Sequence, residues 1–161
     1  MYITLDRYVE LYGKVEHSVF NRACYDACKY MDRHTTGIDG VRKLRDYFPV
    51  SESSVEAVER CTAEIVNIIA QIQEAEKSAS VGRGYTQTEN GLQGKVVSSV
   101  SAGNESISYS ATGDQASAID AAVSDLTARD KLIRNTIHHY LSGETDKNGV
   151  SLLYLGVYPC V

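Results

Sequence analysis

Apolar residues recur every three or four positions in three long stretches of this chain. The stretches are residues 18–34, 53–77 and 114–141. This spacing places the apolar side chains on one face of a helix. Each stripe needs a partner surface, so the three predicted helices are expected to pack against one another.

A fourth, shorter helix is predicted at residues 4–12. Thr4 can cap its first turn, and Gly13 ends the apolar pattern. The predicted fold class is therefore mainly α, a small bundle of about four helices. At 161 residues, the chain suits one domain with a single core, spanning residues 1–161.

Cap signals suggest where the two longest helices begin. Ser53 followed by Glu56 matches a capping box, with Ser51 and Ser54 as alternative caps. The helix of residues 53–77 would span roughly 35 Å. The last helix is expected to run unbroken to Leu141, with Asp114 or Ser117 as its cap and Gly143 just beyond its end.

Residues 78–113 have a different character, rich in Gly, Ser, Thr, Asn and Gln. Within this insert, the alternation of residues around Ala102-Gly103-Asn104 predicts a β-hairpin. A lone two-stranded hairpin is marginal in water, so we expect another protein surface to order it. The residues predicted to contact neighbouring subunits through this arm are Val96, Val97, Val100, Ile107 and Tyr109.

Two further segments are predicted outside regular helices. Residues 38–48 are expected to form a loop with a short helical turn, and their mixed charges indicate either a solvated face or a contact patch for an acidic partner. Residues 144–161 form an extended tail without charge after Lys147. The predicted partner contacts in this tail are Leu152, Leu153, Tyr154, Leu155, Gly156, Val157 and Tyr158.

Composition narrows the classes of function. A net charge of −5 argues against a dedicated nucleic-acid binder, although DNA could pass such a protein without being held. No apolar run is long enough for a transmembrane helix, and the N-terminal residues do not match a secretory signal, so we expect a protein made and kept in a cytoplasm. Eleven tyrosines against two phenylalanines and no tryptophan fit interface residues or half-buried core edges.

Candidate catalytic and metal sites are weak. Cys24 and Cys28 share one helix face and could bind zinc with His138 or His139, but buried packing explains them more simply. A nucleophile pair of Cys61 and His139 would lack an orienting acid. We find no hydrolase, zinc-protease, P-loop or dinucleotide motif. The chain is therefore expected to be no enzyme and to need no cofactor or metal.

Several segments, taken in order, resemble one protein family. SVFNRACYDACKYMDRHTTG is similar to a helix with an A-x-x-Y-[IM]-D-x-x-T pattern, GNESISYS to an "ES-x-S-x-SY" segment, and LLYLGV to an "LLYRGV" tail. The family is that of the head-tail connector, or adaptor, proteins of tailed phages and prophages of Gram-positive bacteria. The resemblance covers nearly the whole chain. Leu155 stands where the family pattern has Arg, which puts any salt bridge at that position in doubt.

The resemblance implies a structural protein of the virion neck, assembled in the host cytoplasm. Such proteins form a homo-oligomeric ring, generally of twelve subunits, beneath the portal protein. The ring extends the DNA channel and joins the capsid to the tail, a stopper or a tail-terminator protein. The insert and the C-terminal tail would make the contacts between proteins. The alternative from the sequence is a helical adaptor or regulator that acts as a dimer outside any virion.

Overall fold

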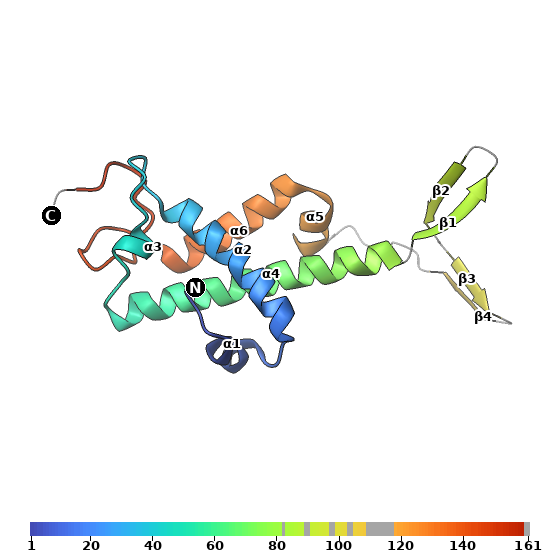
Figure 1. Cartoon of the computed structure of the whole chain (residues 1–161), viewed down its shortest axis with the longest axis horizontal. Coiled ribbons are helices and arrows are strands. Elements are labelled where there is room, and N and C mark those ends of the chain that lie inside the picture. Colours follow the sequence, from blue (N-terminus) through green and yellow to red (C-terminus); the bar gives the residue numbers. More distant parts are fainter. Residues whose placement is uncertain (82, 89–90, 97–98, 103–104, 109–117, 160–161) are drawn as a thin grey trace.

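The computed structural model describes residues 1–81, 83–88, 91–96, 99–102, 105–108 and 118–159 of the chain. Its centre is one long helix, α4 (Glu52–Val81), along which the other helices are arranged (Figure 1). Two helices, α2 (His17–Thr35) and α6 (Leu126–Leu141), pack on α4, and α5 (Ala118–Ser124) lies beside α6 and α4. The prediction of a mainly helical bundle is confirmed.

The core lies where the apolar stripes of α2, α4 and α6 meet. The predicted stripes supply it almost entirely, because apolar side chains at helical spacing turn inward together. Its fully buried members include Ala23, Cys24, Ala27, Met31, Val58, Cys61, Ile65, Val66, Ile133, Ile137 and Leu141.

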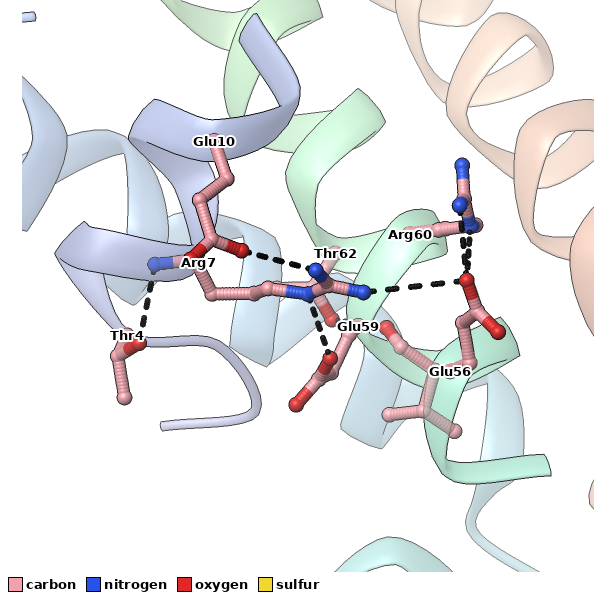
Figure 2. Close-up of polar contacts among 8 residues, drawn as sticks. Thr4, Arg7, Glu10, Glu56, Glu59, Arg60 and Thr62 are labelled. Atoms are coloured by element: carbon pink, nitrogen blue, oxygen red, sulfur yellow. Dashed lines mark hydrogen bonds and ion pairs between the residues drawn. The ribbon is translucent and has the colours of Figure 1, made fainter. Parts of the chain in front are cut away.

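The short helix α1 (Leu5–Tyr12) is attached to α4 by both apolar and charged contacts. Thr4 accepts a hydrogen bond from the Arg7 backbone N–H at 3.2 Å, so the predicted cap is confirmed. Tyr8 is buried and packs on Phe20. Figure 2 shows Arg7 reaching from α1 to α4, where its Nε lies 3.1 Å from Glu59 Oε2.

The helices predicted at residues 53–77 and 114–141 differ in part from the predictions. At the start of α4, Ser51 Oγ accepts from the Ser54 backbone N–H at 3.2 Å, so the alternative cap Ser51, and not Ser53, is the cap. The predicted single C-terminal helix is wrong, because the chain breaks at Asp125 into α5 and α6. Asp125 leaves helical geometry, and its side chain caps α6 by accepting from the Thr127 N–H at 2.8 Å.

Four short strands lie beyond the C-terminal end of α4 (Figure 1). Strand β1 (Arg83–Thr88) pairs antiparallel with β2 (Gly91–Val96), and β3 (Ser99–Ala102) pairs antiparallel with β4 (Glu105–Ser108). Each pairing joins strands that are neighbours in sequence. The predicted role of this insert as an arm that other subunits order stays a prediction.

Candidate interaction surfaces

The C-terminal tail folds back onto the bundle at the end opposite the strands (Figure 1). After α6, residues 144–152 form a tight turn in which Thr145 and Ser151 pair as an antiparallel bridge. The Asp146 carboxylate holds this turn by accepting from the backbone N–H groups of Asn148 and Val150, both at 2.9 Å. The turn directs Leu152 into the core, where its side chain is fully buried.

Lys43 is the principal polar contact between the tail and the rest of the fold. It begins the short helix α3 (Lys43–Asp46), and only 1% of its surface is exposed. Its ammonium donates a hydrogen bond to the backbone carbonyl of Tyr154. Burial lowers the pKa of Lys43, and the nearby carboxylates of Asp146 and Asp39 oppose that shift. A buried cation therefore holds the tail through a backbone atom.

Tyr158 makes a second set of contacts further along the tail. Its backbone N–H donates to Asp39 Oδ2 at 2.6 Å, and its hydroxyl donates to Asp146 Oδ2 at 2.6 Å. Its ring stacks on Tyr47 with centroids 4.5 Å apart. Hydrogen bonds from the backbone N–H groups of Tyr158 and Val41 lower the pKa of Asp39. The tail is thus fixed at two points, ten or more residues beyond the last helix.

The backbone of the tail runs directly against the loop between α2 and α3. The Ile38 N–H donates to the Leu155 carbonyl at 2.9 Å. A Cβ atom added at Gly37 would lie 2.8 Å from the Gly156 carbonyl oxygen, so the two backbone segments approach too closely for any larger residue there. Position 155 thus contributes to the fold through its backbone, which the leucine in place of arginine leaves intact.

This arrangement leaves a group of apolar side chains on the surface. We call them the apolar rim: Ile38, Tyr154, Leu155 and Val157, with exposed fractions of 83%, 48%, 51% and 66%. The backbone bond between residues 38 and 155 holds both sides of the rim together. Exposed apolar side chains that are fixed in position are typical of protein contact surfaces.

The predicted tail contacts therefore divide into two groups. Leu152 belongs to the core and Leu153 is half-buried. The prediction that both residues contact a partner protein is therefore wrong for Leu152, and only part of the Leu153 side chain is exposed for such a contact. Tyr158 is committed to Asp146 and Tyr47. Tyr154, Leu155 and Val157 are exposed, with Gly156 between them.

The predicted arm contacts lie on or near the strands. Val96 ends β2, and Val100 in β3 is paired with Ile107 in β4. Val97 and Tyr109 lie outside the described residues.

Sequence reasoning missed the role of residues 38–48. The interpretation as a solvated face is wrong for Lys43, which is buried. Arg45 pairs with Asp32 of α2 at 2.7 Å. No local signal could have singled out Lys43, because its partner carbonyl is more than one hundred residues away in sequence.

The candidate chemical residues do not converge on a site. Among the residues that the structure describes, no group of three or more His, Cys, Asp or Glu side chains is arranged to hold a metal ion. His138 and His139 are both exposed. A hydrogen bond from Cys24 lowers the pKa of Cys28 to about 7, and burial raises the pKa of Cys61 to about 12.

No helix in the described part of the chain has both the length and the apolar character needed to cross a membrane. Comparison of the chain with known protein families, curated proteins and solved structures finds no match. The chain's fold and surfaces therefore have to be interpreted from its own residues.

Proposed function

We propose that this chain is a structural protein of the virion neck, a subunit of a ring that sits beneath the portal and joins the capsid to the tail or stopper. The ring would extend the DNA channel without holding the DNA, consistent with the net charge of −5. The proposal starts from the resemblance of GNESISYS and LLYLGV to the connector family.

The apolar rim is the observation that supports this function best. It is a fixed apolar surface at one end of an elongated molecule, while the strands lie at the other end (Figure 1). A ring subunit needs separate surfaces for the portal and for its neighbours in the ring. In the proposed assembly, the rim contacts the portal and the arm contacts the next subunit, which supplies the partner that isolated two-stranded pairs lack.

The proposal assigns the chain an assembly role and no catalytic one. Its partners would be other copies of itself, in a ring that generally has twelve subunits in the family it resembles, together with the portal and a tail-side protein. It would be made in the host cytoplasm and would function in the virion. The rim needs no cofactor or metal for this role, because apolar contact and backbone hydrogen bonds are sufficient for docking.

Point substitutions on the rim test the portal contact. Removing the whole tail would also remove the buried Leu152, so a truncated chain could fail simply because its core is damaged. The sharper variant is Leu155→Asp with Val157→Asp, which places two charges on exposed positions. We expect it to keep its circular dichroism spectrum and melting temperature but to lose attachment to portal-bearing capsids in cosedimentation.

The matched control is Tyr25→Asp, which charges an exposed apolar position on α2 outside the rim. It should attach as well as the unchanged chain. Electron microscopy of the purified protein with and without portal rings provides the second readout. A stable dimer that never forms a ring or binds a portal would refute the proposal and favour the adaptor or regulator instead.

A further inference from the structure

The outer face of α6 carries cations that the fold does not neutralise. Lys131, Arg134 and His138 are all exposed and lie three and four residues apart, so they share one face of the helix. Among the described residues, Lys131 and Arg134 have no hydrogen bond or ion pair. Arg33, at the end of α2, joins this group, which we call the basic face, and His34 lies beside it.

Electrostatic coupling places these groups close together. The pKa of His34 is lowered first by burial and then by the charges of Arg134, Arg33 and His138. The acid beside them is Asp130, whose carboxylate lies 3.9 Å from Arg33 with both side chains largely exposed. An ion pair this open to water is weak, and one carboxylate cannot balance the charges of Arg33, Lys131 and Arg134. The basic face therefore keeps a net positive charge.

Two other cations of the fold are paired internally. Arg45 bonds Asp32 at 2.7 Å, and Arg129 bonds Glu76 at 2.5 Å. By contrast, the side chains of Lys131 and Arg134 lie on one face of α6 and have no internal partner among the described residues. The position of this unpaired group suggests contact with an anionic surface outside the subunit.

The same molecule carries an acidic surface around α1 and the start of α4. Figure 2 shows Arg7 surrounded by the carboxylates of Glu10, Glu56 and Glu59, with Glu56 also 2.7 Å from Arg60. Asp6 lies four residues before Glu10 on α1, and Glu52 four residues before Glu56 on α4, so both extend this surface. Five carboxylates therefore face two guanidinium groups. We call this the acidic face.

We infer that the basic face of one copy docks on the acidic face of the next copy, as a head-to-tail contact between subunits. The occupant is a second copy of this chain because the complementary charges are found on the chain itself. A two-fold dimer through the basic face would oppose like charges, whereas a head-to-tail contact pairs opposite ones. Figure 1 shows α1 and α6 on different sides of α4, as repeated head-to-tail contacts require.

This inference rests on the proposed function and specifies which surfaces form the ring. It adds a charged contact to the apolar rim and the arm. Because both faces are exposed, the attraction should fall as salt rises.

Charge reversal on each face provides the test. Lys131→Glu with Arg134→Glu makes the basic face acidic, and Asp6→Lys with Glu52→Lys makes the acidic face basic. None of these four side chains has a hydrogen bond or ion pair among the described residues, so the fold should survive in both variants. Each variant alone should self-associate at least about tenfold more weakly than the unchanged chain in sedimentation velocity at low salt.

An equal mixture of the two variants should recover association. If the two variants alternate in the assembly, every contact again joins opposite charges. One kind of contact pairs the native basic face with the native acidic face, and the other kind pairs the two reversed faces. Charge reversals that leave self-association unchanged, or a mixture that does not recover it, would overturn the inference. The melting temperature of each variant shows whether it is folded.

Two further measurements separate this inference from its rivals. Fluorescence anisotropy with a labelled DNA duplex tests whether the basic face binds nucleic acid. Loss of DNA binding in Lys131→Glu/Arg134→Glu with self-association unchanged would assign the face to DNA and overturn the subunit contact. If the unchanged chain forms portal-bound rings but the reversals have no effect, only this inference fails. If it never self-associates, with or without portal rings, the proposed function fails as well.

Discussion

The two ends of the molecule show how similar sequence character leads to different structural roles. The tail of residues 144–161 and the insert of residues 78–113 both lack the long apolar stripes of a helix in their sequence. The tail returns to residues 36–48 and is fixed there by buried and polar contacts. In the insert, each strand is paired with its neighbour in sequence. The buried side chain of Leu152 and the buried Lys43 that bonds the Tyr154 carbonyl give the tail its place in the core.

The substitution with the largest expected effect on stability is Leu152→Ala, in the buried part of the tail. Because Leu152 is fully buried, its truncation should lower the free energy of unfolding by about 2–5 kcal/mol through lost apolar burial and the cavity that remains. Urea denaturation followed by circular dichroism measures the change. Leu155→Ala is the matched control, since Leu155 is half exposed and should change stability by no more than about 0.5 kcal/mol. Equal losses would mean that the tail is not part of the core.

Lys43→Met tests the polar half of the tail contact. Methionine fills most of the same volume but cannot donate to the Tyr154 carbonyl, so stability should fall by about 1–3 kcal/mol. Limited proteolysis should also cut the tail sooner. Lys147→Met is the control, because the exposed Lys147 side chain donates to the Asp46 carbonyl at 3.1 Å and lies over the Tyr47 ring. Its substitution should lower stability by less than about 1 kcal/mol. Similar losses for both would contradict a special role for Lys43.

In contrast to the tail variants, which should lose stability, a variant in which a short Gly/Ser linker replaces residues 83–115 should stay about as stable as the unchanged chain. The strands pair with one another, and loop-closure entropy depends only weakly on length, so stability should change by less than about 1 kcal/mol. Self-association should weaken if the arm contacts the next subunit. The same two experiments, denaturation and sedimentation, separate these effects. A stability loss above about 2 kcal/mol would mean that the insert belongs to the monomer fold.

The sequence predicted the helical core well and the polar contacts poorly, for a physical reason. The stripe of α4 that contains Val58 and Ile65 and the stripe of α6 that contains Ile133 are visible because helical spacing is a local property. The break at Asp125 was missed because one residue can either continue a helix or cap a new one. The burial of Lys43 and the pairing of Tyr158 with Asp39 depend on the path of the whole chain. They leave no spacing signal, so they required the structure.

The smallest expected effect concerns the acid response of the tail. The pKa of Asp39 is lowered from its usual 3.8 by the N–H groups of Tyr158 and Val41, so its contribution is present above that value and is lost as the pH falls through the lowered pKa. The Tyr158 amide signal in nitrogen–proton NMR spectra should therefore shift as the pH falls below 3.8 and through the lowered pKa of Asp39. Asp39→Asn should remove that shift, because an amide side chain does not titrate there. A shift that persists in Asp39→Asn would show that the response does not arise from Asp39, and would contradict the assigned contact between this carboxylate and the Tyr158 N–H.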